Sequence, residues 1–123
     1  ADAAVARCVI RLVVSIAAHS PLMAEAATTF RQALDETPFR TPTIPVVTNA
    51  TARPVEDPEA LRAALAKQLT SPVRWSESAR WMIDQGVTQF IEVGPKDVLT
   101  GLLRRIDRSV ERQTAEQALG REI

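Results

Sequence analysis

The chain has 123 residues, which is enough for one domain of modest size. Its fifteen basic and fifteen acidic side chains balance, so no overall charge favours nucleic acid or a membrane surface as partner. No apolar run approaches the roughly 20 residues that span a bilayer. One cysteine and one histidine can form neither an internal disulfide nor a zinc site. We therefore expect a soluble protein of a reducing setting, by default the cytoplasm.

The first predicted elements are a strand and a helix. Residues 9–16 form a β-branched apolar run that is typical of a buried strand. Ser20 and Pro21 then supply a helix start, because a hydroxyl N-cap is followed by proline at the first helical position. This helix is expected to end near Asp35. Its apolar face has four-residue spacing: Leu22, Ala26, Phe30 and Leu34.

A proline-rich connection and a second helix come next. Three prolines keep residues 37–45 extended. Residues 44–48 predict a short strand, which is closed by a loop over residues 49–54. Asp57 and Pro58 then start a helix that ends before Ser71-Pro72.

The rest of the chain predicts two more helices and one strand. A helix over residues 76–85 ends at Gly86, a left-handed C-cap. Residues 87–93 predict a strand, and Gly94-Pro95 turns the chain. The last helix places five apolar residues on one side: Val98, Leu99, Leu102, Leu103 and Ile106. We expect a frayed polar tail over residues 108–123.

Strands that alternate with helices predict an α/β fold with a parallel sheet and flanking helices. Three strands and about four helices would leave long apolar edges on such a sheet. The chain also begins with Ala1 rather than Met. We therefore expect a domain that is incomplete in this chain and continues in a larger parent.

His19 is the main candidate for chemistry. It follows the first predicted strand, at the kind of position where ligands bind in open α/β sheets. Histidine can act there as a general base, although a histidine that only hydrogen-bonds a loop is the more common case. No serine lies in a G-x-S-x-G elbow, Ser20 is better used as the helix cap, and Cys8 lies in an apolar strand. The residues alone thus give a base without a nucleophile.

Arg104 and Arg105 are a second candidate. A dibasic pair at a helix end usually means a solvated end that suits the helix dipole. Docking of an acidic partner is the alternative interpretation.

The segment His19-Ser20-Pro21-Leu22-Met23 resembles the histidine motif of malonyl-CoA:acyl carrier protein transacylases and of polyketide synthase acyltransferase domains. The resemblance continues in the family's order through residues 44–49 (IPVVTN), 68–75 (QLTSPVRW), 92–95 (EVGP) and 99–102 (LTGL). It implies an α/β-hydrolase-like large subdomain with an inserted ferredoxin-like small subdomain. Residues 1–18 would end the small subdomain and form the return strand. Residues 19–107 would be the C-terminal part of the large one, before the polar tail over 108–123.

The resemblance also implies the reaction of fatty acid and polyketide synthesis. A serine attacks malonyl-CoA, and the malonyl group then passes to the phosphopantetheine thiol of acyl carrier protein, without a cofactor. His19 would be the base, and the backbone carbonyl at Gln68 would orient it. Ala18 and Asn49 would line the substrate pocket.

The same resemblance implies that Arg104 and Arg105 dock the acidic carrier protein. The resemblance implies neither nucleic acid nor a membrane as a partner.

Three features depart from the family's pattern. The serine, the oxyanion-hole glutamine and the arginine that holds the malonyl carboxylate lie upstream in the family and are not in this chain. Ala18 replaces a phenylalanine usual in malonyl-selective members, and Gly94-Pro95-Lys96-Asp97 replaces the more common G-P-G-K. Besides an enzyme fragment that needs the missing N-terminal half, two alternatives stay open: a non-catalytic carrier-binding relic and one half of a split acyltransferase.

Overall fold

The computed structural model describes residues 16–120. Cys8 and nearly all of the strand expected over residues 9–16 lie outside the described residues. The described elements, in chain order, are the 3-10 turn η1 (Pro21–Met23), α1 (Ala24–Glu36), β1 (Val46–Val47), β2 (Pro54–Val55), α2 (Pro58–Gln68), α3 (Trp75–Asp84), β3 (Gln89–Glu92), α4 (Val98–Ile106), β4 (Glu111–Thr114) and α5 (Ala115–Ala118).

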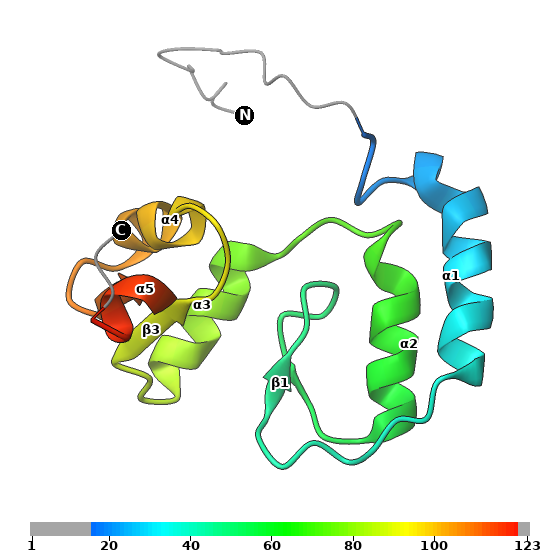
Figure 1. Ribbon diagram of the computed structural model, residues 1–123, viewed down its shortest axis with the longest axis horizontal. Coiled ribbons are helices and arrows are strands. Elements are labelled where there is room, and N and C mark those ends of the chain that lie inside the picture. The colour runs from blue at the N-terminus through cyan, green and yellow to red at the C-terminus, as the bar shows by residue number, and fades with distance from the viewer. Residues whose placement is uncertain (1–15, 121–123) are drawn as a thin grey trace, which may run out of the picture.

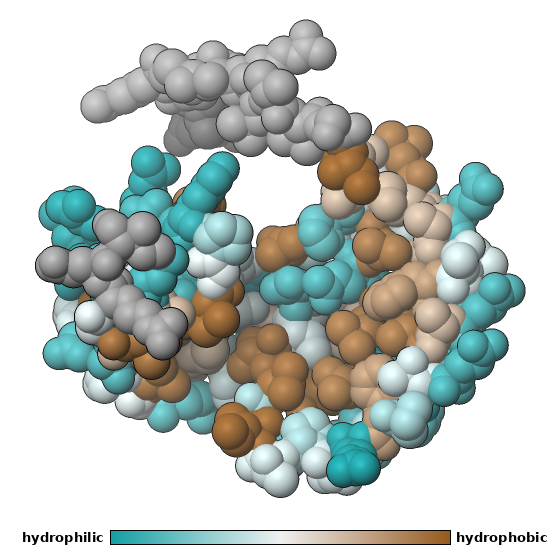
Figure 2. Space-filling model, in the orientation of Figure 1, coloured by the Kyte–Doolittle hydropathy of each residue, from teal (hydrophilic) through white to brown (hydrophobic). Residues whose placement is uncertain are grey.

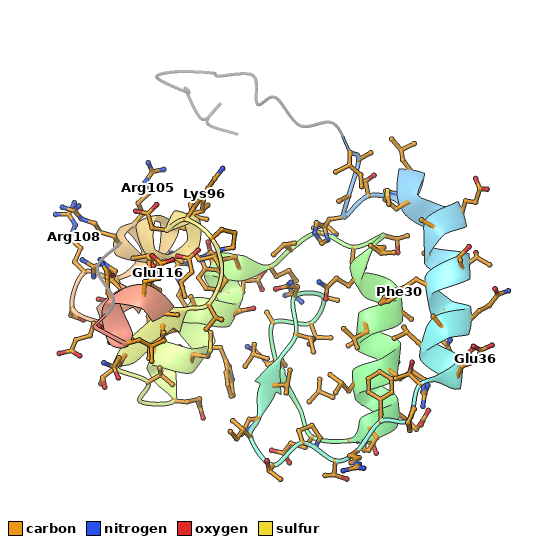
Figure 3. The ribbon with its side chains drawn as sticks, viewed as in Figure 1. Phe30, Glu36, Lys96, Arg105, Arg108 and Glu116 are labelled. Carbon is orange, nitrogen blue, oxygen red and sulfur yellow. The ribbon has the colours of Figure 1, made fainter. Side chains whose placement is uncertain are left out.

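The elements gather in two groups (Figure 1). Helices α1 and α2 pack side by side, and β3, β4, α3, α4 and α5 form the other group. The β1–β2 hairpin lies between them. Phe30, one of the residues of the predicted apolar face, lies between α1 and α2 (Figure 3).

Local signals set the helix starts and ends as the sequence predicted. The Asp57 carboxylate accepts a hydrogen bond from the backbone N–H of Ala60 at 2.8 Å, with Pro58 at the first helical position. Gly86 follows α3 with φ +91°, a left-handed conformation that glycine adopts without a Cβ clash. The interpretation of both residues as helix boundaries is confirmed.

The strand predicted over residues 44–48 forms a hairpin. It is shortened to β1, which pairs antiparallel with β2 in the register Val46 to Val55. The predicted loop is displaced by one residue, because Thr48 already lies outside β1 and Pro54 already belongs to β2. The turn closes locally, since the N–H of Ala52 donates to the Thr48 carbonyl at 2.9 Å.

Strand β3 pairs in parallel with β4, a strand that the sequence analysis did not predict. This pair and its helices enclose a small core of Ala79, Leu103 and Val110, each at most 6% exposed. The expectation of a frayed polar tail from residue 108 is wrong for residues 110–118. A strand needs only its backbone to pair, and buried Val110 anchors it, so the polar side chains of residues 111–114 gave no signal.

Many large apolar side chains remain exposed in the described residues. Of the predicted α4 face, only Leu103 is fully buried and Ile106 half-buried. Figure 2 shows further apolar residues on the surface over the α1–α2 pair and towards β3. The exposed large apolar residues include Leu22, Ile44, Val73, Ile91, Val93, Val98, Leu99 and Leu102. Exposed apolar surface of this extent is typical of an interface with further protein, as expected for a partial α/β domain.

Candidate active site

His19 lies in a tight turn directly before η1. Its backbone φ is +62°, in the left-handed region that histidine visits more often than most residues. Ser20 fixes the start of the turn after it. The Ser20 hydroxyl donates to the Ala17 carbonyl at 2.7 Å and accepts the Leu22 N–H at 3.3 Å. The hydroxyl proton of Ser20 is therefore engaged, and the interpretation of Ser20 as a helix cap agrees with its contacts.

The structure brings His19 to Gln68, 49 residues further along the chain. The Nδ1 atom of His19 lies 2.9 Å from the backbone carbonyl oxygen of Gln68. Gln68 is the last residue of α2, and the last four carbonyls of a helix have no partner within it. A carbonyl oxygen can only accept, so Nδ1 must donate its proton to it. The neutral ring is thereby held as the tautomer whose Nε2 carries the free lone pair.

The contact with Gln68 places His19 at the C-terminal end of α2. His19 is half-buried and meets this end directly. The same contact can therefore orient the ring so that Nε2 is free to accept a proton.

The predicted pocket residues have weaker links to His19. Ala18 is its half-buried chain neighbour. Asn49 lies in the hairpin turn, where its carbonyl accepts the backbone N–H of Arg74 at 3.1 Å. Within residues 16–120, no hydrogen bond joins Asn49 to His19. Their roles as pocket residues stay predictions.

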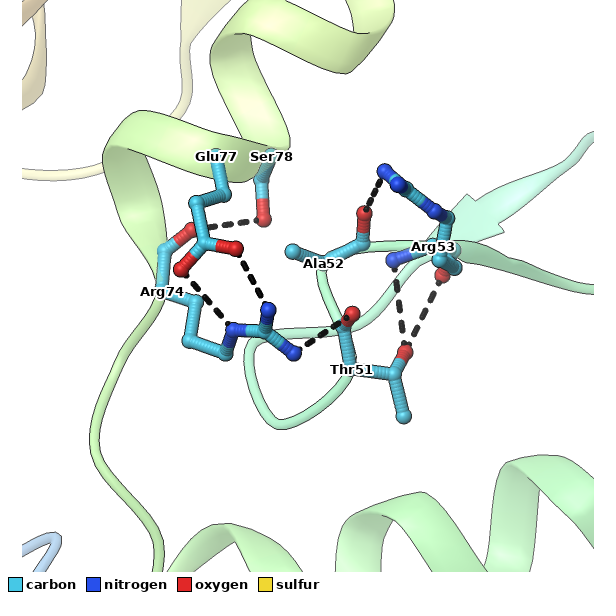
Figure 4. A network of polar contacts seen from close by, with 6 residues as sticks. All are labelled: Thr51, Ala52, Arg53, Arg74, Glu77 and Ser78. Atoms are coloured by element: carbon cyan, nitrogen blue, oxygen red, sulfur yellow. Dashed lines mark hydrogen bonds and ion pairs between the residues drawn. The ribbon is translucent and has the colours of Figure 1, made fainter.

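Arg74 holds the hairpin turn against α3 (Figure 4). Its guanidinium pairs with the Glu77 carboxylate through two nitrogens, one of them at 2.9 Å, and donates to the Thr51 carbonyl at 3.1 Å. The hydrogen bond from Arg74 lowers the pKa of Glu77. Sequence reasoning missed this contact, although Arg and Glu three residues apart at a helix start are a recognisable pair. It fixes the position of the segment that follows Gln68.

Glu92 is a second residue whose role sequence reasoning missed. Its carboxylate accepts the backbone N–H groups of Leu99 and Thr100 at 3.0 and 2.7 Å, and the Thr100 hydroxyl at 2.7 Å. The bond from the Thr100 N–H, the largest cause, lowers the pKa of Glu92. The carboxylate caps α4 from seven residues upstream, which no local capping spacing reveals. The EVGP motif thereby sets where α4 begins.

Arg104 and Arg105 lie in the last turn of α4, exposed to solvent. Helix α4 belongs to the group around β3, whereas His19 precedes α1 (Figure 1). The structure therefore does not bring this pair together with His19.

A cavity of about 200 Å³ lies beside β3. Its lining is mostly apolar and includes Trp75, whose buried Nε1 atom has no hydrogen-bond partner among the described residues. His19 is not part of this cavity. The lining residues are Trp75, Phe90, Ile91, Glu92, Val93, Leu99, Thr100 and Leu103.

Residues 16–120 hold neither a metal-binding cluster nor a helix that could span a membrane. No cluster of three or more His, Cys, Asp or Glu side chains is placed to hold a metal ion. None of the helices there combines the length and the apolar character needed to cross a membrane.

Comparison with known proteins places these motifs in a family. No family model matches the chain. The malonyl CoA-acyl carrier protein transacylase of Staphylococcus aureus (strain COL) is 40% identical over 118 residues, which are 94% of this chain and 38% of the relative. That of Bacillus subtilis is 40% identical over 97 residues, 79% of this chain and 24% of the relative. The chain belongs to the malonyl-CoA:acyl carrier protein transacylase family and corresponds to its C-terminal portion.

Solved structures agree. The transacylase of Xanthomonas oryzae matches with a TM-score of 0.82 and 38% identity over 89% of this chain and 36% of that one. The acyl carrier protein S-malonyltransferase of Vibrio cholerae matches with a TM-score of 0.80 and 42% identity, over 85% of this chain and 34% of that one. A malonyl-transacylase solved with its type II PKS acyl-carrier protein matches with a TM-score of 0.79 and 39% identity, over 85% of this chain and 34% of that one. The chain thus spans less than two fifths of these transacylases, and the predicted incomplete α/β acyltransferase fold is confirmed.

Proposed function

We propose that this chain supplies the histidine base for transfer of a malonyl group from coenzyme A to the phosphopantetheine thiol of acyl carrier protein. The observation that carries the proposal is the 2.9 Å contact between His19 Nδ1 and the Gln68 carbonyl, which leaves Nε2 free to accept a proton. The names of the transacylase relatives supply the substrates. This enzyme acts in fatty acid or polyketide synthesis.

The first half of the reaction forms an acyl-serine. A serine hydroxyl gives its proton to Nε2 of His19 while its oxygen attacks the malonyl thioester carbonyl. The tetrahedral intermediate then collapses, the carbon–sulfur bond breaks, and the coenzyme A thiolate takes the proton back from Nε2. The Gln68 carbonyl holds the ring throughout.

The second half reverses these roles. The phosphopantetheine thiol gives its proton to Nε2, and its sulfur attacks the acyl-serine carbonyl. The serine oxygen leaves and takes up the proton, so His19 ends as it began. Over the two halves one thioester is exchanged for another, and His19 accepts and returns one proton in each half.

The serine comes from outside these 123 residues in our proposal. The sequence holds no G-x-S-x-G elbow, and the Ser20 hydroxyl is engaged by its two backbone contacts. The partner of the chain is therefore the N-terminal portion of the same enzyme. The exposed apolar side chains described above are the surface that such a portion would cover.

Acyl carrier protein is the second proposed partner. A relative of similar fold was solved in complex with its acyl-carrier protein. Arg104 and Arg105 are exposed cations that suit an acidic protein surface.

A chimera tests the catalytic proposal. This chain replaces the matching segment of the Staphylococcus aureus relative, and malonyl transfer to carrier protein is measured. His19→Ala should lower kcat by about 10²- to 10⁴-fold, the usual contribution of a general base. The matched control Gln68→Ala should stay within about twofold, because it keeps the backbone carbonyl.

Full activity of the His19→Ala chimera would contradict the proposed role of His19. Turnover by the purified 123-residue chain alone would contradict an external serine. A chimera that binds carrier protein and transfers nothing would favour the non-catalytic relic.

A further inference from the structure

Arg74, the residue directly before α3, joins the hairpin turn to the start of that helix (Figure 4). Its backbone N–H donates to the Asn49 carbonyl at 3.1 Å, and its guanidinium donates to the Thr51 carbonyl at 3.1 Å. On the other side, the guanidinium pairs with the Glu77 carboxylate through two nitrogens. The Arg74 carbonyl accepts the Ser78 N–H at 3.0 Å and the Ser78 hydroxyl at 3.1 Å. One residue thus holds two parts of the chain together.

The hairpin turn that Arg74 holds has a shape fixed by its own contacts. The hydroxyls of Thr48 and Thr51 are hydrogen-bonded at 2.7 Å, and the Thr51 hydroxyl accepts the Arg53 N–H at 3.3 Å. Ala52 is 1% exposed and has a φ of +54°. A residue with a Cβ keeps such a conformation only where its surroundings determine it. The Thr51 carbonyl is therefore offered to Arg74 from a defined position.

The connection from Gln68 to Arg74 is short and stiff. The backbone N–H and the hydroxyl of Thr70 both donate to the Lys67 carbonyl, at 3.2 and 3.3 Å, so the chain turns back on the end of α2. Pro72 fixes its own φ and restricts the residue before it to extended conformations. Few backbone dihedral angles are left to absorb a displacement. A shift of Arg74 therefore moves the end of α2.

A second ion pair of the same kind shows what is particular to Arg74. Arg31 and Asp35 pair at 3.0 Å within α1, and both side chains are about half exposed, at 52% and 53%. The Arg74 and Glu77 side chains are similarly exposed, at 44% and 56%. Exposed pairs of this kind contribute little to stability by themselves. Arg74 differs in its added hydrogen bond to Thr51, 23 residues earlier in the chain.

We propose that Arg74 is a positioning residue for the base. By holding the hairpin turn against α3 it fixes the end of α2, and the Gln68 carbonyl then stays in place to accept the Nδ1 proton of His19. Without Arg74 the carbonyl shifts, and the neutral ring exchanges between its two tautomers. One of these carries its proton on Nε2 and cannot act as a base there. The effect on transfer rests on the proposed function, whereas the tautomer is a property of the chain itself.

The tautomer of His19 can be read directly, because it is the only histidine of the sequence. The full chain is prepared with ¹⁵N-labelled histidine, and the long-range ¹H–¹⁵N NMR spectrum is recorded at about pH 9, where imidazole is neutral. In the native chain, Nδ1 should have the shift of a protonated ring nitrogen and Nε2 that of an unprotonated one. In Arg74→Leu both shifts should move towards each other, because the ring then exchanges between tautomers.

Three further variants separate positioning from a general effect on the fold. Arg31→Leu is the matched control, since it breaks an exposed ion pair and leaves the hairpin untouched; the His19 spectrum should not change. Glu77→Gln removes the ion pair and keeps the bond from the guanidinium to Thr51, so it too should leave the spectrum native. Arg74→Lys keeps the charge and loses the planar fork, so its spectrum should be intermediate. Circular dichroism checks folding, and Arg74→Lys decides where Arg74→Leu does not fold.

The active chimera gives the kinetic counterpart. Arg74→Leu should lower kcat about 10- to 100-fold, the scale expected when a group is misplaced by a change away from the chemistry. The KM for malonyl-CoA should stay within about twofold, because Arg74 touches no reacting atom in this proposal. A merely structural role would lower the melting temperature and leave the tautomer of His19 as it is in the native chain.

A native tautomer in folded Arg74→Leu, or an equal change in Arg31→Leu, would overturn the proposal. So would exchange between tautomers already present in the native chain, since the Gln68 carbonyl would then not hold the ring. The two proposals fail separately. Altered tautomers with unchanged kcat in Arg74→Leu would support positioning and contradict His19 as the base. A loss of kcat in His19→Ala, with native tautomer and kcat in Arg74→Leu, would support the base and refute positioning by Arg74.

Discussion

Replacing Val110 by alanine removes two buried carbon atoms from the core that joins α3, α4 and the β3–β4 pair. Val110 is 6% exposed and packs with Ala79 and Leu103. Two methylene equivalents contribute about 1.6 kcal/mol at about 0.8 kcal/mol each. The cavity left behind brings the expected loss to about 2 kcal/mol. Because the substitution lies just before β4, it measures whether that strand packs in solution.

The assay is thermal and urea unfolding of the full chain, followed by far-UV circular dichroism. At roughly 4 °C per kcal/mol for a chain of this size, Val110→Ala should lower Tm by about 8 °C. Leu119→Ala is the matched control, because that side chain is 71% exposed and should change stability by less than about 0.5 kcal/mol. Equal effects of the two substitutions would show that residues 110–114 do not pack, and the frayed tail would then be the better description.

Two other substitutions test the helix cap and the acyl pocket. Glu92 has a lowered pKa in the folded chain, so it adds stability above its usual pKa of 4.5, and that stability is lost as pH falls through the lower folded value. Native chain and Glu92→Gln should therefore differ in Tm at neutral pH and converge in acid; a constant difference down to low pH would refute the cap. Ala18→Phe in the active chimera should narrow acyl choice, raising the ratio of kcat/KM for malonyl over methylmalonyl thioesters by up to about tenfold. An unchanged ratio would remove Ala18 from the pocket.

Local signals in the sequence predicted the helices well. Asp57-Pro58 begins α2, Gly86 ends α3, and α4 spans the predicted apolar face. Each of these signals acts within one or two helical turns, so the residues that begin or end a helix lie next to it in the sequence.

The strands were harder to predict, because a strand depends on a pairing partner that lies elsewhere in the sequence. The pairing of β3 with β4 joins residues 89–92 to residues 111–114 through backbone atoms, and the polar side chains of the second segment hide it. The β1–β2 hairpin depends on a six-residue turn that had the composition of a plain loop. In both cases the hydrogen-bonding partner lies outside the window in which side-chain patterning is informative.

The candidate site likewise contains some contacts that the sequence indicated and others that it did not. The sequence motifs singled out His19 and the position of Gln68, and the structure places their atoms in contact. Glu92 and Arg74 lie within motifs that were recognised, yet their capping and clamping contacts reach across 7 and 23 residues. Spacing alone gives no reason to expect these contacts.

The contact between His19 and Gln68 shows why the neighbouring segments matter to the chemistry. Because the acceptor is a backbone carbonyl, its position depends on where α2 ends and on nothing in the Gln68 side chain. The segment after α2 is fixed by Arg74, whose N–H and guanidinium hold the hairpin turn at Asn49 and Thr51. A change at Arg74 therefore reaches the histidine through the chain between residues 68 and 74. In our proposal, residues that never meet the substrate thus set the orientation of Nε2, and the motif over residues 68–75 supports His19.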